Sequence, residues 1–156
     1  MTLDEARAVA AGVPDPELPV VTLADLGILR DVLPRDDGGV EVVITPTYSG
    51  CPAMDAIRDD IRRALPGATV TTVLSPPWTT EWITEEGRAK LREHGISPPG
   101  RVVSLAPPTR AEPAGVCCPR CGSGRVRLVS RYGSTACKAL YTCAACLEPF
   151  DHVKEI

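Results

Sequence analysis

The sequence predicts an α+β fold: a small sheet with helices packed on one face, followed by a separate C-terminal β-ribbon. Three observations support this prediction. Helical periodicity alternates with short branched apolar stretches through residues 1–105, prolines cluster in 106–116, and two Cys-x-x-Cys pairs lie in 117–156. We therefore expect two domains, 1–105 and 117–156, joined by a semi-extended linker at 106–116.

The first predicted element is a helix over residues 3–11. Thr2 and Glu5 form a capping-box pattern, because each side chain can bind the free backbone amide of the other residue, and Gly12 suits the end of the helix. The segment 13–19 holds three prolines, which remove amide donors and fix the backbone, so it is expected to be a rigid acidic loop.

A hairpin and the main helix are expected next. Residues 28–33 and 40–45 are apolar and branched, and the Arg-Asp-Asp-Gly-Gly sequence between them is typical of an antiparallel turn. Residues 52–65 carry apolar side chains at helical spacing before a Pro-Gly stop. A strand at 69–74 and a helix at 84–94 follow.

The last element predicted for the first domain is a short strand at 101–105, which completes the order αββαβα(β). In the ribbon, residues 125–129 and 139–142 are expected to form strands behind two metal-binding turns.

Four cysteines at metal-ligand spacing lie in the ribbon. Cys118 and Cys121 form one pair, Cys143 and Cys146 form the other, and four thiolates so placed can enclose one ion tetrahedrally. We expect a structural zinc site on these residues, and an iron or iron–sulfur site stays open as an alternative. Disulfides are disfavoured, since no signal peptide precedes the chain and a reducing cytoplasm is expected.

Three further cysteines lie outside this set. Cys117 adjoins Cys118 and could shift the ligand register, although the x2 spacing favours Cys118. Cys137 is either a small buried apolar residue or a spare thiolate. Cys51 lies between the second strand and the main helix, so we expect it at or beside the helix N-cap, where free amides and the helix dipole would lower its pKa below about 8.5.

Charge and composition argue against several classes of partner, and the mildly basic ribbon leaves nucleic acid only weakly open. Residues 1–114 carry 11 basic and 17 acidic side chains, a net charge of −6, whereas residues 115–156 carry 6 and 3, a net charge of +3. The acidic first part argues against a nucleic-acid surface, and basic residues of the ribbon are not interleaved with a run of aromatics. The chain has no apolar run long enough to span a bilayer, so we expect no membrane association.

Five segments carry a family resemblance: Asp15–Val20, Asp25–Leu29, Pro46–Pro52, Gly133–Tyr141 and Glu148–Asp151. Three segments resemble the signatures of the MIP18 (DUF59) family of iron–sulfur assembly factors, and two in the ribbon resemble the D-subunit branch found in the bacterial phenylacetyl-CoA epoxidase system. A departure occurs at His152-Val153, where that branch usually carries an aromatic pair.

The resemblance implies a non-catalytic accessory role, with phenylacetyl-CoA epoxidase components as partners and the maturation or maintenance of an oxygenase metal centre as the task. A single Cys51 cannot hold an iron–sulfur cluster, so a transient cluster would be shared across a homodimer or with a client. Thr47, Glu17 and Asp25 could complete or tune that site if they fold near Cys51. Alternatively, Asp25 caps a turn and Glu17 is solvated.

Two other functions stay open from the sequence. An enzyme with Cys51 as nucleophile would need a base, and the only histidines are His94 and His152. The second alternative is a zinc-ribbon module that binds a protein partner and has no metal-transfer role.

Overall fold

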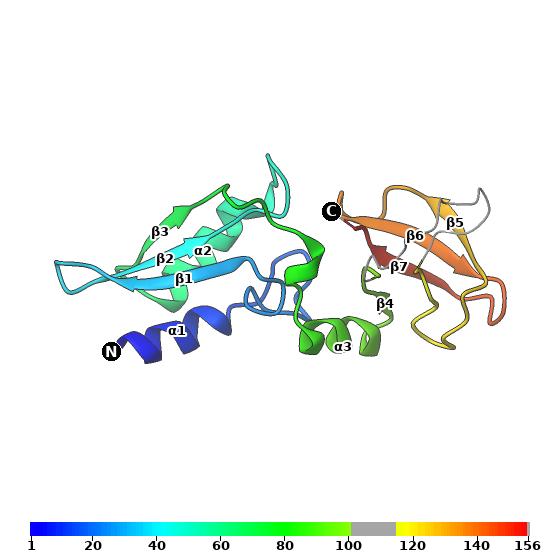
Figure 1. The fold of residues 1–156 in the computed structure, drawn as a ribbon, viewed down its shortest axis with the longest axis horizontal. Helices are drawn as coiled ribbons and strands as arrows, with labels where there is room; N and C mark the ends of the chain where they lie inside the picture. The colour runs from blue at the N-terminus through cyan, green and yellow to red at the C-terminus, as the bar shows by residue number, and fades with distance from the viewer. Residues whose placement is uncertain (101–114, 156) are drawn as a thin grey trace. The chain divides into compact units, whose positions relative to one another are not determined.

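The computed structural model describes residues 1–100 and 115–155. Contacts divide the chain into two compact units, residues 1–87 and 88–155, which Figure 1 shows in the colours of the chain order. Each unit has its own small sheet, with helices confined to the first unit and the start of the second. The α+β fold class expected from the sequence is confirmed.

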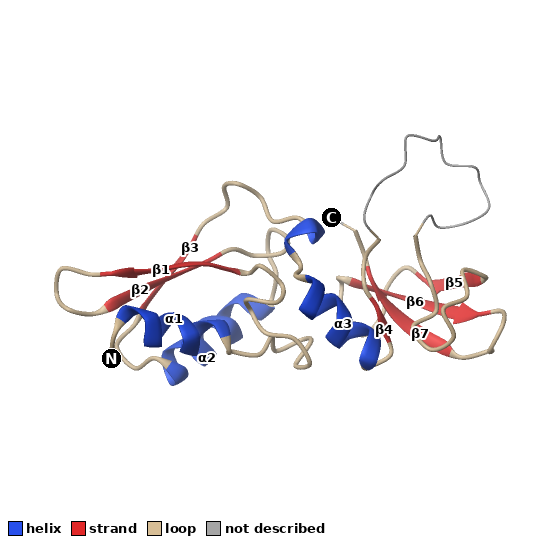
Figure 2. Ribbon diagram, turned by 60° about the horizontal axis from the view of Figure 1, so that its bottom comes forward, coloured by secondary structure: helices blue, strands red, loops and turns tan. Residues whose placement is uncertain are grey.

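The sheet of unit 1 has the order β1-β2-β3. Strands β1 (Leu29–Pro34) and β2 (Val40–Ile44) form the predicted antiparallel hairpin, and β3 (Thr69–Thr72) lies parallel to β2. A parallel neighbour requires a crossover, which α2 (Ala53–Ala64) supplies. Figure 2 shows α2 and α1 (Leu3–Ala11) on the same side of this sheet.

The capping box predicted for α1 is present. The backbone N–H of Thr2 donates to the Glu5 carboxylate at 2.7 Å, and the N–H of Glu5 donates to the Thr2 hydroxyl at 3.2 Å. In α2 the apolar positions that recur at helical spacing face inward and join the two buried positions of β2 in one core. Fully buried members of this core are Val21, Leu23, Val42, Ile44, Ile57 and Ile61.

Gly27 and Trp82 form a close packing contact in unit 1. Gly27 has φ 71°, and a Cβ there would lie 2.7 Å from the Cβ of Trp82 in the short helix η1 (Thr80–Trp82). The indole N–H of Trp78 donates to the carbonyl of Leu26 at 2.8 Å. A glycine is therefore required at position 27 both by the backbone conformation and by the close approach.

Unit 2 contains the ribbon sheet, in the order β4-β7-β6-β5. Strands β5 (Val126–Ser130), β6 (Lys138–Cys143) and β7 (Pro149–Val153) are antiparallel, and the two-residue strand β4 (Ile96–Ser97) lies parallel to β7. Helix α3 (Glu85–Glu93) leads into β4.

The core of the ribbon is small and includes metal-site residues. Tyr141 stacks on Phe150 with ring centroids 5.9 Å apart. His152 is 2% exposed and meets Tyr141 edge to face at 5.6 Å. The imidazole thus takes the buried place expected for an aromatic ring. The buried members of the core are Val116, Cys118, Ala139, Tyr141, Cys143 and Phe150.

The two units do not divide where the predicted domains do. Residues 88–100, expected at the end of the first domain, belong to unit 2 because β4 pairs with β7 and because the Arg88 guanidinium donates to the carbonyl of Pro99. The predicted strand 101–105 and the linker up to residue 114 lie outside the described residues. Within the described part of the chain, every helix is too short or too polar to span a bilayer.

Candidate metal centre

The first Cys-x-x-Cys pair forms a tight turn before β5. The backbone N–H of Gly122 donates to the carbonyl of Cys118 at 2.9 Å, and the N–H of Cys118 donates to the carbonyl of Ser123 at 2.9 Å. Gly122 has φ 74°, a left-handed conformation that glycine adopts without a steric penalty. This turn directs Cys118 and Cys121 toward one point.

The second pair forms an equivalent turn between β6 and β7. The N–H of Leu147 donates to the carbonyl of Cys143 at 3.0 Å, and the N–H of Cys143 donates to the carbonyl of Glu148 at 2.9 Å. The N–H of Ala145 points to the Cys143 sulfur at 3.3 Å. Leu147 has φ 65° and is the non-glycine residue of the described chain with a positive φ.

The structure brings the four predicted ligand cysteines together. All four Sγ atoms lie within 4.8 Å of one another, with Cys118 Sγ and Cys146 Sγ 3.7 Å apart and Cys121 Sγ and Cys143 Sγ 3.6 Å apart. A tetrahedral ion with metal–sulfur bonds of about 2.3 Å would set sulfur–sulfur distances of about 3.8 Å. The donor set and its spacing therefore fit one tetrahedral metal ion.

The electrostatics of this cluster also favour a cation. The backbone N–H of Cys146 lowers the pKa of the Cys143 thiol to about 6, with help from other donors around that sulfur. Although the N–H of Glu148 favours a thiolate at Cys146, burial and hydrogen bonds to the neighbouring thiols raise the pKa of Cys146 to about 12. Protein groups alone therefore support ionisation of only part of the cluster, and a bound cation would stabilise the rest.

The neighbouring cysteines lie outside this cluster. Cys117 is exposed, and its sulfur is not among the four that converge, so the converging set begins at Cys118. Cys137 is partly buried, with its sulfur 3.0 Å from the hydroxyl oxygen of Thr135.

The second candidate centre is the loop before α2 in unit 1. Pro52 is the N-cap of this helix, so Cys51 lies one residue outside it and is partly buried. The N–H of Cys51 donates to the carbonyl of Tyr48, and the N–H of Met54 donates to the carbonyl of Cys51, each at 3.3 Å. The thiol therefore lies beside the start of the helix, as expected.

The expected lowering of the Cys51 pKa is wrong. Burial raises the pKa of this thiol, and the carboxylates of Glu17 and Asp15 raise it further, against the opposing effects of the Ala53 N–H and the Thr47 hydroxyl. Helix amides do act on the sulfur, but desolvation and two negative charges outweigh them. Cys51 is consequently a protonated thiol at neutral pH in this environment.

The acidic residues of the loop have different roles. Glu17 is partly buried, and its carboxylate raises the pKa of the Cys51 thiol, whereas the Thr47 hydroxyl lowers it. Asp15 was not among the predicted site residues, yet its carboxylate also acts on that thiol and accepts the N–H groups of Glu17 and Leu18 at 2.9 and 2.7 Å. Its place in the Asp-Pro-Glu sequence, two residues before Glu17, was the signal that could have identified it.

Asp25 has a structural position in the same unit. Its carboxylate accepts the N–H of Thr22 at 2.9 Å, its own N–H donates to the Thr22 hydroxyl at 3.1 Å, and its carbonyl accepts the N–H of Thr84 at 2.8 Å. Asp25 is absent from the groups that shift the Cys51 pKa. The geometry thus matches the turn-capping alternative considered for this residue.

A pocket of about 300 Å³ lies along the segment that leads to Cys51. Thr47 and Ser49 contribute hydroxyls to it, and Leu74 and Trp78 contribute apolar walls. The hydroxyl of Thr45, at the start of the same segment, is buried and has no hydrogen-bond partner among the described residues. The loop therefore adjoins a hollow with mixed polar and apolar walls.

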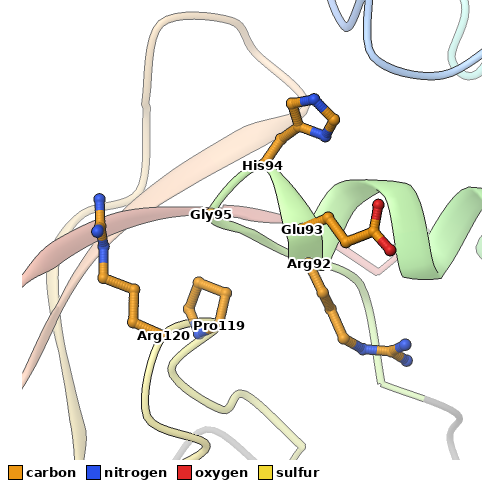
Figure 3. Close-up of a pocket in the computed structure, with 6 residues that line it drawn as sticks. All are labelled: Arg92, Glu93, His94, Gly95, Pro119 and Arg120. Atoms are coloured by element: carbon orange, nitrogen blue, oxygen red, sulfur yellow. The ribbon is translucent and has the colours of Figure 1, made fainter.

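A second pocket, of about 500 Å³, lies in unit 2 beside the first cysteine turn. Figure 3 shows that the side chains of Arg92 and Arg120 point in different directions and converge on no common point. Arg120 forms an ion pair with Glu148 at 3.9 Å, and His94 Nδ1 lies 2.8 Å from the carbonyl of Lys90. This arrangement offers no assembled acid, base and nucleophile.

Comparisons with protein families match both parts of the chain. Residues 3–75 match the family described as iron-sulfur cluster assembly protein, and residues 105–154 match the family described as PaaD zinc beta ribbon domain. The chain is 46% identical over 155 residues to an Escherichia coli (strain K12) protein provisionally named as the D subunit of 1,2-phenylacetyl-CoA epoxidase, covering 96% of this chain and 91% of that protein.

Other relatives resemble the N-terminal part. A Porphyromonas gingivalis (strain ATCC BAA-308 / W83) protein named Fe-S protein maturation auxiliary factor is 34% identical over 83 residues, covering 49% of this chain and 78% of that protein. A crystal structure of a DUF59 domain of unknown function from Bacillus anthracis matches with a TM-score of 0.52 and 26% identity, covering 57% of this chain and 90% of that chain.

Proposed function

From the premise that this chain belongs to the family of 1,2-phenylacetyl-CoA epoxidase D subunits, we propose that it is an accessory component of such an epoxidase in phenylacetate degradation. Its task is to assist the maturation of an iron–sulfur or di-iron centre of the multicomponent oxygenase, rather than to catalyse the ring epoxidation. The match of residues 3–75 to an iron-sulfur cluster assembly family supports this role.

The observation that carries the proposal is the position of a single thiol, Cys51, beside the start of α2. Cys51 is the only cysteine of unit 1. The Glu17 carboxylate raises the pKa of its thiol, and the Thr47 hydroxyl lowers it. An iron–sulfur cluster normally needs four protein ligands. Cys51 would therefore hold a cluster or iron ion as cargo only together with ligands from a client or a second copy of the chain, and such shared ligation suits transfer.

The raised pKa of Cys51 fits a site whose thiol stays protonated and unreactive until a metal cargo binds. A protonated thiol is a poor nucleophile and a poor ligand, so the free chain is protected from adventitious metal and from oxidation. Binding of a cation would displace the proton, because a positive charge beside the sulfur opposes the effect of the Glu17 and Asp15 carboxylates.

The proposed resident metal is zinc in the ribbon, bound by Cys118, Cys121, Cys143 and Cys146. Zinc supplies structural closure of the two turns and no redox chemistry. The family match of residues 105–154 supports this choice over iron. The seven free cysteines of the chain also suit a reducing cytoplasm, which is the compartment we propose.

A second candidate function is a zinc-ribbon module that binds a protein partner and transfers no metal. The protonated state of Cys51 is compatible with it, because a purely structural thiol needs no ionisation. An enzyme with Cys51 as nucleophile has less support: residues 1–87, which surround that thiol, contain no histidine to serve as its base.

Replacement of Cys51 separates these functions. The full chain with Cys51→Ala, co-expressed with the epoxidase components, should fold normally and yield an oxygenase with lower iron content and lower epoxidase activity than the wild type. Cys137→Ala, which removes another partly buried thiol, is the matched control and should leave both readouts unchanged. Full iron content and activity in the Cys51→Ala strain would exclude the maturation role and favour the protein-binding module.

A further inference from the structure

One edge of the ribbon sheet carries positive charge that the ribbon does not neutralise. Strand β5 is the last strand in the order β4-β7-β6-β5, and among the described residues it pairs only with β6 (Figure 2). Arg125, Arg127 and Arg131 lie on or beside this strand, are exposed, and form no ion pair with any described residue. Lone positive charges at an exposed edge are complementary to an acidic partner.

The acidic residues of the ribbon are engaged elsewhere. Glu148 pairs with Arg120 at 3.9 Å, and Asp151 lies 4.0 Å from the ammonium group of Lys138. Glu155 lies 3.5 Å from His152 Nε2 and accepts the N–H of Gly100 at 3.0 Å. Because residues 115–155 contain no other carboxylate side chain, the arginines of β5 have no ribbon group left to pair with.

The backbone of β5 also has groups directed to the open edge. The N–H of Ala144 donates to the backbone carbonyl of Arg125 at 2.7 Å, so the backbone polar groups of Arg125 are directed toward β6. Because these groups alternate in direction along an antiparallel strand, those of Arg127 are also directed toward β6, and the N–H and C=O of Leu128 are directed to the open edge. The N–H of Val126 is already donated to Gly124 at 3.0 Å. An added strand would therefore pair with Leu128.

Apolar side chains accompany these charges. Leu128 is 42% exposed, Val129 is 51% exposed at an irregularity in the β5 ladder, and Tyr132 is 73% exposed. Exposed apolar side chains of this kind on an edge strand supply contact area for a partner strand. Native edges are usually protected, and this one combines open hydrogen-bonding groups with apolar contact area.

We propose that β5 is a docking edge for an extended acidic segment of a partner protein, which adds to the ribbon as a further strand and places carboxylates opposite Arg125 and Arg127. A second copy of the chain is a poor occupant, because pairing β5 with β5 would bring arginines against arginines. The inference goes beyond the proposed function, since it depends on the folded ribbon and not on cargo at Cys51.

The test uses the zinc-loaded full chain and a fluorescent short peptide of alternating glutamate and threonine. Binding by anisotropy should weaken with salt, should fall when glutamine replaces glutamate, and should be lost when alternate peptide amides are N-methylated, because N-methylation prevents strand pairing at unchanged charge. Binding that survives N-methylation would overturn strand addition.

Variants of the chain sharpen the result. Arg125→Glu with Arg127→Glu should weaken binding about tenfold or more, whereas Arg62→Glu with Arg63→Glu, the same charge change on α2, should have little effect. Leu128→Pro should fold, since its N–H faces outward, yet lose the peptide, while Leu128→Ala should bind more tightly than Leu128→Pro. Equal binding by the two Leu128 variants would contradict the proposal.

Two further outcomes would refute it. A labelled single-stranded oligothymidine that binds more tightly than the acidic peptide would identify the edge as a nucleic-acid surface. A dimer in sedimentation that Leu128→Pro dissociates would assign the edge to a second copy of the chain. Retained peptide binding by Cys51→Ala is expected, and it separates this inference from the proposed function.

Discussion

Gly122 and Leu147 adopt the same left-handed backbone conformation at equivalent positions of the two cysteine turns, with φ values of 74° and 65°. Each residue follows the second cysteine of its pair, and each donates its N–H to the carbonyl of the first cysteine, Cys118 or Cys143. Glycine adopts this conformation freely, whereas a leucine does so at a cost of about 1–2 kcal/mol. The two turns thus share one geometry with different intrinsic stability.

Leu147→Gly should therefore stabilise the zinc-loaded ribbon by about 1 kcal/mol, because it relieves the strained conformation and removes a side chain that is 76% exposed. Gly122→Ala should destabilise it by a similar amount. Urea unfolding followed by the ribbon amides in NMR spectra measures both changes. Gly124→Ala is the control: its φ is not left-handed and a Cβ there meets no atom within 4 Å, so its effect should be small. A destabilised Leu147→Gly variant would contradict this account.

Removal of the metal should unfold the ribbon and leave unit 1 folded. The core of the ribbon has few apolar side chains beyond Tyr141 and Phe150 and includes Cys118 and Cys143, whereas unit 1 has a core of fully buried aliphatic residues. Both tryptophans, Trp78 and Trp82, lie in unit 1, so their fluorescence reports on that unit alone.

A strong chelator is expected to move the amide signals of residues 115–155 into the random-coil region and to leave the tryptophan emission unchanged. Zinc added back should restore the signals. Loss of tryptophan emission on chelation would show that the two units do not fold independently.

Cys51 should react slowly with iodoacetamide at neutral pH. Its pKa is raised by burial and by the charges of Glu17 and Asp15, so the reactive thiolate is a small fraction at pH 7 and grows about tenfold with each pH unit until the raised pKa is reached. Glu17→Gln removes one of these charges, lowers the pKa and should speed alkylation at a fixed pH between 7 and 9.

Site-resolved mass spectrometry over a pH series measures this rate. Asp36→Asn, a neutralisation in the hairpin turn that is not among the groups acting on Cys51, should leave the rate unchanged. Exposed Cys117 supplies an internal reference in the same sample. Faster alkylation of Cys51 than of Cys117 at pH 7 would be incompatible with the raised pKa.

Replacement of Asp25 should lower the stability of unit 1, whereas replacement of Glu17 should not. Asp25→Ala leaves the partly buried N–H of Thr22 without its carboxylate acceptor and should cost about 1–2 kcal/mol of unfolding free energy, while Asp25→Asn should recover part of that loss because its amide oxygen can still accept. Glu17→Ala should change stability by less than about 0.5 kcal/mol. Urea titrations followed by the emission of Trp78 and Trp82 give the values. An Asp25→Ala variant with unchanged unfolding free energy would contradict the turn-capping role and point to a role of Asp25 at the Cys51 loop.

Local patterns in the sequence identified most elements of the fold. The capping pair Thr2 and Glu5, the apolar repeat of α2 and the spacing of the two cysteine pairs depend on residues close together in the chain, so each could be interpreted without knowledge of the rest. Each local turn sets two of the sulfurs, whereas the pairing of β5 with β6, which places Val126 opposite Cys143, brings the two turns together.

Tertiary structure alone decided the features that depend on distant residues. Strand β4 has only two residues, and its pairing with β7 over more than fifty intervening positions moved the unit boundary to residue 87. The same holds for the pKa of Cys51. The sequence predicted the effect of the helix start on this thiol, but burial and the charges of Glu17 and Asp15, more than thirty residues away in the chain, reversed the direction of the shift. Hydrogen-bonding patterns are short-range, whereas desolvation and charge act through space, so the sequence determined the elements and the fold determined the chemistry of the thiol.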